Sequence, residues 1–323
     1  MRPLKFHPIL KQTLWGGERI IPYKELASEL SRVGESWELS GMPGSESVVA
    51  EGPWTGSTLP ELIGRFGAEL LGKANYARFG QEFPLLVKFI DAREDLSIQV
   101  HPDDELARKR HGKSGKCEMW YVLEAEPGAS LLTGFSRPIA PAEYERRVAD
   151  NTLTDVLNRQ AIASGDVFYL PAGRVHSIGK GSFIVEIQQS SDITYRIYDF
   201  DRRDAAGNSR ELPNELAREA IDFESSENSR ITYAPENNQE VRLVTTPYFT
   251  TSLYTLTART RCDWSATDSF VAIVLLQGSG SLTDNEGNRI DVRQGETWLL
   301  PASTQWTEIT PHTATLRLLT SRI

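Results

Sequence analysis

Two segments of the chain resemble each other closely enough to indicate an internal duplication. Residues 165–178 read GDVFYLPAGRVHSI, and residues 295–308 read GETWLLPASTQWTE. A glycine, an acidic residue, a leucine, a proline and an alanine coincide at a constant offset between the two segments. At one position the copies differ sharply, because His176 of the first is matched by Trp306 of the second. The repeat predicts two similar modules, of which only the first has kept this histidine.

Short runs of β-forming residues, separated by turn signals, dominate the chain from Phe83 onward. The runs that predict strands are 84–90, 96–101, 116–123, 167–170, 183–188 and 193–198. Many short strands with regular turns are typical of a β-sandwich or barrel, and the duplication predicts two such modules. Helical patterns are confined to 58–72, 142–148, 153–157 and 213–222. We therefore expect a mainly β protein of two β-sandwich modules with short helical insertions.

A change in composition predicts the boundary between the modules. Residues 224–239 are rich in Glu, Ser and Asn and indicate a solvated connector. The N-terminal module, which carries the helical insertions, is expected over residues 1–223. The C-terminal module, a degenerate copy that gives packing support, is expected over residues 240–323.

Composition and charge limit the classes of function. The 323 residues carry a formal net charge of −9, which disfavours a nucleic-acid partner because phosphate backbones bind clustered basic residues. No apolar run reaches the length of a membrane span, and the N-terminus lacks the apolar segment of a signal peptide. Cys117 and Cys262 are too few and too far apart for a disulfide framework. We expect a cytoplasmic protein with no membrane or nucleic-acid partner.

Strand alternation gathers metal-ligating side chains inside the first module. Residues i and i+2 of a strand share a face, so Gln99 and His101 point together. Glu118 lies on a second strand, and His176 follows a Pro-Ala-Gly turn at the mouth of a third. Imidazole nitrogens and carboxylate oxygens bind zinc, whereas an amide oxygen is a less usual ligand. Because the second copy kept the scaffold but not His176, this histidine is indicated as functional, and Trp306 is expected to fill the space of the lost metal site.

Four further polar side chains lie in strands that are otherwise apolar. Lys88 is either a surface lysine whose stem crosses the strand or an amine held near a site. Lys116 shares a face with Glu118 and would lie beside a metal bound there. Arg196 suits a phosphate, because its planar guanidinium meets two oxygens at once. Arg196 and Glu186 fit structural ion pairs equally well, so their roles stay open on these grounds.

Four separated motifs resemble one family of enzymes. They are residues 96–104 (LSIQVHPDD), 115–121 (GKCEMWY), 171–176 (PAGRVH) and 191–196 (SDITYR). Together with the N-terminal segments 15–17 (WGG) and 34–40 (GESWELS), they resemble type I mannose-6-phosphate isomerase, most of all its shorter bacterial form. The resemblance covers most of the chain and is weakest in the C-terminal module.

The resemblance implies a cupin fold for each module, one Zn²⁺ ion per chain, and a sugar phosphate as substrate. The implied reaction is the reversible conversion of mannose 6-phosphate to fructose 6-phosphate through a cis-enediol. The metal ligands implied are Gln99, His101, Glu118 and His176. The catalytic residues implied are Arg196, Lys116 and Glu186. The residues expected to bind substrate are Ser97, Lys88 and Arg196.

Two other functions are compatible with a metal-binding cupin. A sugar-binding or regulatory cupin would hold its ligand without chemistry, but the presence of Lys116, Glu186 and Arg196 beside all four ligands favours the isomerase. A metal-dependent oxygenase would need an iron site of two histidines and one carboxylate.

Lys116 and Glu186 both stay candidates for the general base. The oligomeric state, the role of the C-terminal module and the use of other sugar phosphates also stay open.

Overall fold

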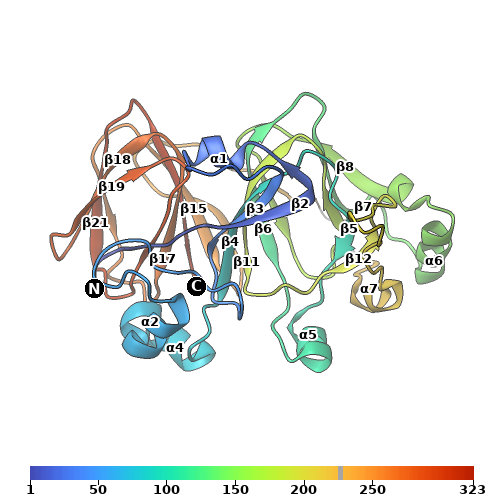
Figure 1. Ribbon diagram of the computed structural model, residues 1–323, viewed down its shortest axis with the longest axis horizontal. Helices are drawn as coiled ribbons and strands as arrows, with labels where there is room; N and C mark the ends of the chain where they lie inside the picture. The colour runs from blue at the N-terminus through green and yellow to red at the C-terminus, as the bar shows by residue number, and fades with distance from the viewer. Residues whose placement is uncertain (225–227) are drawn as a thin grey trace.

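Two β-sandwiches lie side by side in the computed structural model, which describes residues 1–224 and 228–323 (Figure 1). The larger sheet of the first sandwich has seven strands, in the order β13 (Arg230–Ile231), β9 (Val167–Leu170), β6 (Glu118–Ala125), β11 (Ser182–Gln189), β4 (Leu85–Asp91), β3 (Val33–Leu39) and β2 (Ile9–Gly17). Its smaller sheet has five strands, in the order β12 (Tyr195–Tyr198), β5 (Ile98–Val100), β10 (His176–Ile178), β7 (Ser130–Phe135) and β8 (Leu157–Ala161). The prediction of a mainly β, cupin-type protein is confirmed.

The second sandwich repeats this plan with fewer strands. Its larger sheet has the order β1 (Leu4–Lys5), β20 (Thr297–Leu300), β17 (Val271–Gln277), β22 (Leu316–Arg322), β15 (Thr250–Leu256) and β14 (Val241–Thr245). Its smaller sheet has the order β16 (Thr260–Asp263), β21 (Trp306–Pro311), β18 (Ser279–Asp284) and β19 (Arg289–Arg293).

Two short strands each form the edge of a larger sheet. β1, at the N-terminus, pairs with β20 and so belongs to the second sandwich. β13 lies in the expected connector 224–239 and pairs with β9 of the first sandwich. Residues 225–227 of that connector lie outside the described residues. The N-terminal strand therefore belongs to the second sandwich, whereas the connector strand extends the first.

Short helices lie between the strands at the edges of the sandwiches. They are α1 (Ile20–Tyr23), α2 (Leu59–Phe66), α3 (Ala68–Leu71), α4 (Lys73–Phe79), α5 (Asp104–His111), α6 (Pro141–Ala149), the 3₁₀ turn η1 (Leu153–Val156) and α7 (Asn214–Ala220). α2 begins as predicted, because the Thr58 hydroxyl accepts from the Glu61 amide and the Glu61 carboxylate accepts from the Thr58 amide. The helix expected over 58–72 is divided, because Gly67 adopts φ 51° and ends α2. Within the described residues, no helix combines the length and apolar character needed to span a membrane.

The seven-stranded sheet has one apolar face and one face that mixes apolar and charged side chains, and this division positions the site. Phe89 and Val185 are fully buried and belong to one apolar cluster with Leu319 of the second sandwich. Because strand residues alternate, their neighbours Lys88 and Glu186 point the other way, into the first sandwich. The outer face thus contributes hydrophobic stabilisation, at about 25 cal/mol per Å² of buried apolar area. The inner face is left to hold charged side chains.

The expectation for Trp306 is wrong. Trp306 is only half-buried, and the guanidinium carbon of exposed Arg261 lies 4.1 Å from its ring centroid. The next residue, Thr307, is fully buried and accepts a hydrogen bond of 2.9 Å from Trp264 Nε1. Because side chains alternate along β21, Thr307 points into the second sandwich and Trp306 points out. An apolar cluster that includes Trp264 and Trp298 fills that interior instead.

Candidate metal centre and active site

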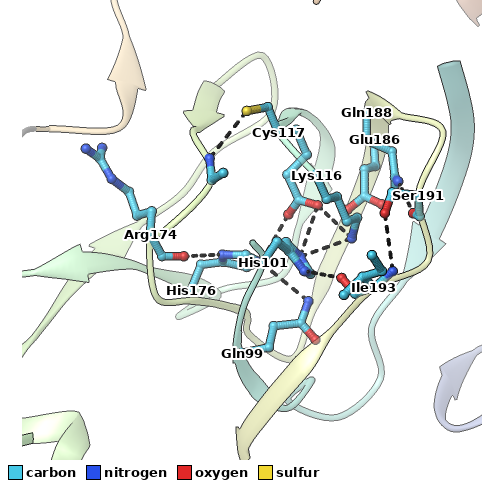
Figure 2. A network of polar contacts seen from close by, with 12 residues as sticks. Gln99, His101, Lys116, Cys117, Arg174, His176, Glu186, Gln188, Ser191 and Ile193 are labelled. Atoms are coloured by element: carbon cyan, nitrogen blue, oxygen red, sulfur yellow. Dashed lines mark hydrogen bonds and ion pairs between the residues drawn. The ribbon is translucent and has the colours of Figure 1, made fainter. Parts of the chain in front are cut away.

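Three potential metal ligands meet between the two sheets of the first sandwich (Figure 2). Glu118 opens β6 of the larger sheet, whereas His176 opens β10 of the smaller sheet and His101 follows β5. One ligand atom from each residue lies within 4.8 Å of those of the other two, and all three side chains are buried. The structure therefore brings together residues that are far apart in the sequence but share one interior.

Backbone carbonyls fix the orientation of both imidazoles. His101 Nδ1 lies 2.8 Å from the Ile193 carbonyl oxygen, and His176 Nδ1 lies 2.8 Å from the Arg174 carbonyl oxygen. A carbonyl only accepts, so each Nδ1 carries the proton and each Nε2 presents its lone pair to the interior. The two Nε2 atoms lie 3.5 Å and 3.1 Å from the Glu118 carboxylate. This arrangement is typical of histidines that bind a metal.

The charges of the cluster also suit a cation. Although burial favours the protonated acid, Lys116, His176 and His101 hold the pKa of Glu118 well below its usual range. Burial and then Lys116 lower the pKa of His101 to about 3. Lys116 Nζ lies 2.9 Å from Glu118 Oε2 and 3.1 Å from His101 Nε2. The carboxylate is thus ionised and the imidazole of His101 neutral, which are the forms that bind metals.

Gln99 lies at the edge of the same cluster. It is directly opposite His176 in the pairing of β5 with β10, and its Nε2 is 3.4 Å from His176 Nε2. Its Oε1 accepts a hydrogen bond of 3.2 Å from the Ser97 hydroxyl. Rotation of the amide by 180° would turn Oε1 toward the cluster, and the Ser97 hydroxyl can then accept from Nε2. Ser97 contacts the site through Gln99.

Lys88 and Glu186 form a second buried layer next to the cluster. They are directly opposite each other on β4 and β11, with Nζ and Oε1 3.1 Å apart. Trp120 Nε1 donates a hydrogen bond of 3.0 Å to Glu186, and the Trp120 ring makes an edge contact with that of His176. Burial opposes the charge of Lys88, but Glu186 and Glu35 outweigh it and raise the pKa of Lys88. Lys88 is therefore a paired interior cation and not a surface lysine.

Glu35 is a third member of this layer that the sequence did not indicate. Glu35 Oε2 lies 3.8 Å from Lys88 Nζ and accepts a hydrogen bond from Trp37 Nε1. Burial raises the pKa of Glu35, but Lys88 and Trp37 outweigh burial, so the pKa is lowered. The only signal in the sequence was the motif at residues 34–40, which contains this acidic residue. Nothing in the motif indicates Lys88 as its partner.

Arg196 lies beside Gln99 and outside the three-residue cluster. The two residues are opposite each other in the pairing of β12 with β5. Arg196 is half-buried, and its Nε is a buried atom that lacks a hydrogen-bond partner within the described residues. Burial and then Arg210 lower the pKa of Arg196. A guanidinium at the edge of the interior, whose buried Nε lacks a partner among the described residues, is suited to an anionic ligand.

The segment after Arg196 contains a buried ion pair. A charge-balanced run such as residues 199–204 is typical of a solvated turn, but Asp199 is only 4% exposed. It accepts a hydrogen bond of 2.7 Å from Arg210 Nε, and Arg202 lies 3.6 Å away. A cavity of about 460 Å³, lined by Trp15 and Arg210 among others, lies next to this ion pair. Trp15 also packs in the apolar cluster that contains Trp120, in the interior of the first sandwich.

Comparisons with known proteins agree with the resemblance of the motifs. Residues 4–132 match the family described as phosphomannose isomerase type I, catalytic domain. The chain is 34% identical over 303 residues to the probable mannose-6-phosphate isomerase GmuF of Bacillus subtilis, covering 93% of each chain. It is 33% identical over 302 residues to the mannose-6-phosphate isomerase of Streptococcus mutans, covering 93% of this chain and 92% of that one.

A solved structure gives the same result for the fold. The crystal structure of the mannose 6-phosphate isomerase from Bacillus subtilis matches with a TM-score of 0.90 and 30% identity, covering 100% of both chains. The match includes both sandwiches, so the duplicated plan is common to the two proteins. The chain therefore belongs to the type I mannose-6-phosphate isomerase family, and it is an aldose–ketose isomerase.

Proposed function

We propose that this isomerase depends on one Zn²⁺ ion and interconverts mannose 6-phosphate and fructose 6-phosphate through a cis-enediol. The observation that carries the proposal is the cluster of His101, Glu118 and His176, whose Nε2 atoms and carboxylate converge within 4.8 Å. Neither Glu118 oxygen has a hydrogen bond of good geometry within the described residues, although both are buried. Two neutral imidazoles and an ionised carboxylate fit Zn²⁺, and Gln99 would supply a fourth ligand through its amide oxygen.

A bound zinc ion would act as a Lewis acid that stabilises negative charge on the sugar oxygens during proton transfer. The protein's own residues must then move a proton from C2 to C1. Glu186 suits the general base, because a carboxylate held by Lys88 and Trp120 is fixed in place and can accept a proton. Lys116 suits the opposite role, because its Nζ lies beside the cluster, 2.9 Å from Glu118 Oε2, and a lysine ammonium can donate a proton to a sugar oxygen.

In the first proposed step the C2–H bond breaks, Glu186 takes the proton, and the electron pair forms the C1–C2 double bond of the cis-enediol while the Lys116 ammonium gives a proton to O1. In the second step the same carboxyl group returns its proton to C1, the Lys116 amine takes the proton of the O2 hydroxyl, and the C2 carbonyl forms. Lys116 would stabilise the oxygen on which negative charge develops.

Substrate binding is proposed for the rim of the site. Arg196 would contact the phosphate, because its guanidinium is half-buried and adjoins Gln99. Ser97 would contact the substrate from its position beside Gln99. For Lys88 we propose an indirect contribution through Glu186, because its ammonium is held between two carboxylates.

Metal analysis combined with an isomerase assay tests the proposal. We expect about one zinc ion per purified chain, loss of turnover of mannose 6-phosphate after treatment with a chelator, and recovery when Zn²⁺ is added. Full turnover after complete removal of metal would refute the zinc dependence. Binding of mannose 6-phosphate without turnover would favour a sugar-binding cupin, and iron with oxygen consumption would favour an oxygenase.

A further inference from the structure

Gln188 is a buried polar residue next to the metal centre to which neither the motifs nor the proposed mechanism gives a role. It lies on β11 and is fully buried, directly opposite Glu118 on β6. Residues opposite each other on neighbouring strands point to the same face of a sheet, so Gln188 points into the first sandwich beside Glu118. Figure 2 shows it close to Glu186 and Ser191.

Both hydrogens of the Gln188 amide are used by the backbone that follows. Its Nε2 donates to the carbonyl oxygens of Gln189 and Ser191, at 2.8 Å in each case. A rotated amide would place Oε1 against two carbonyl oxygens, none of which can donate, so the orientation of the side chain is fixed. Through these two hydrogen bonds, Gln188 holds the backbone of the turn formed by residues 189–193.

That turn carries the carbonyl that orients His101. The Ile193 carbonyl accepts from His101 Nδ1 at 2.8 Å, and the Ile193 amide lies 3.4 Å from the Ser191 hydroxyl. A metal-binding histidine depends on such a partner for its tautomer and ring orientation. Without the Gln188 amide, the Ser191 carbonyl loses its donor, and the position of the Ile193 carbonyl is less well determined.

The oxygen of the same amide has no partner. Gln188 Oε1 is a buried atom that accepts no hydrogen bond within the described residues. Lys116 lies two positions before Glu118, which makes it the diagonal neighbour of Gln188, within reach of a long side chain. At present the Lys116 ammonium contacts Glu118 Oε2 and His101 Nε2, which are atoms that a bound cation would take. A displaced ammonium needs a new acceptor in the buried interior.

We propose that Gln188 is a positioning residue of the metal centre. Its amide nitrogen holds the turn that orients His101, and its amide oxygen receives Lys116 when a cation occupies the ligand atoms. The proposal rests on the proposed zinc site, and it extends that site to a residue that neither ligates the metal nor reacts. One side chain would thus couple the geometry of a ligand to that of the adjacent cation.

The variant Gln188→Met tests both parts, because it keeps the length of the side chain and removes the amide. Asn75→Leu is the matched control. Asn75 is also buried and donates to a backbone carbonyl, that of Leu71 at 2.9 Å, but it lies on α4 and packs against Ser269 of the second sandwich. If Gln188→Met does not fold, Gln188→Asn replaces it, because the shorter amide cannot reach both carbonyls.

Zinc affinity is measured first, by competition with a chromogenic chelator. We expect Gln188→Met to bind Zn²⁺ about tenfold or more weakly than the parent protein, as for other residues that orient a ligand, and Asn75→Leu to bind it normally. In the metal-free protein, the NMR signal of the His101 Nδ1 proton should broaden through faster exchange with water. Unchanged zinc affinity together with an unchanged proton signal would overturn the positioning of His101.

Turnover at saturating Zn²⁺ tests the second part. Misplacement of Lys116 should lower kcat about tenfold with little change in KM, because the ammonium acts on the reacting oxygen and not on the phosphate. A kcat equal to that of the parent would overturn this part. If the parent binds zinc but does not isomerise mannose 6-phosphate, the proposed function fails, while the affinity measurement still decides the role of Gln188 at the metal centre.

Discussion

Replacement of Lys88 by methionine should destabilise the protein by leaving two carboxylates in its interior without their cation. Lys88 is 7% exposed, and its ammonium lies 3.1 Å from Glu186 and 3.8 Å from Glu35. At an effective dielectric constant of about 20, each attraction is worth roughly 4–5 kcal/mol before the cost of desolvation. Removal of one partner from a buried pair costs about 3–5 kcal/mol, because the remaining charge is uncompensated. We expect a loss of about 3 kcal/mol or more in the free energy of unfolding.

Urea unfolding of the metal-free protein, followed by tryptophan fluorescence, measures this loss. The double variant Lys88→Met/Glu186→Gln should recover part of it, because the uncompensated charge of Glu186 is removed as well. Lys113→Met is the control, since Lys113 forms an exposed ion pair of 2.9 Å with Asp192 and should cost less than about 1 kcal/mol. If Lys88→Met costs no more than this control, the account of the buried layer is wrong.

Four further predictions follow from the site and the fold. His101→Ala and His176→Ala should each lose bound zinc and turnover together, and normal zinc content in either would refute the ligand assignment. Arg196→Ala should retain zinc but lower kcat/KM about 100-fold or more, through loss of a charged contact worth about 3 kcal/mol; near-normal kinetics would reject its role. Gly67→Ala should lower the unfolding free energy by about 1 kcal/mol or more, because Gly67 has φ 51° and a Cβ would lie 3.2 Å from the Tyr76 ring; an unchanged urea midpoint would contradict this. Burial lowers the pKa of His101 to about 3 in the folded, metal-free protein, whereas its ordinary pKa is 6.5. The free energy of unfolding should therefore fall as the pH falls from 6.5 toward 3, because the unfolded chain binds a proton that the folded protein does not. An unfolding free energy that stays constant over this pH range would contradict this.

The parts of the site that depend on strand alternation were predictable from the sequence. Period-two patterning places His101 with Gln99 and Glu118 with Lys116, and the duplication singles out His176 as the residue that only one copy retains. These inferences need only the strands and their faces, which the chain specifies locally. The mainly β architecture was predictable for the same reason.

The parts that depend on pairing between distant segments were not predictable. Glu35 is identified as important by its contact with Lys88, and the two residues lie on neighbouring strands but are separated by many positions in the chain. The buried ion pair of Asp199 with Arg210 is not indicated by the sequence, because the charged residues around Asp199 are typical of a solvated turn. For Trp306, the repeat aligned the sequences correctly, but the outward direction of its side chain follows from the pairing of β21 with β16.

The apolar outer face of the seven-stranded sheet packs against the second sandwich, in whose described residues no cluster of three metal-ligating side chains is found. Phe89 and Val185 lie on the same two strands, β4 and β11, as Lys88 and Glu186, but their side chains point to the opposite face of the sheet. The charged inner face and the apolar outer face are therefore formed by the same strands. A chain truncated after the connector would expose that apolar surface to water, and large exposed apolar surfaces promote aggregation. The C-terminal sandwich thus covers the apolar face of the N-terminal sandwich.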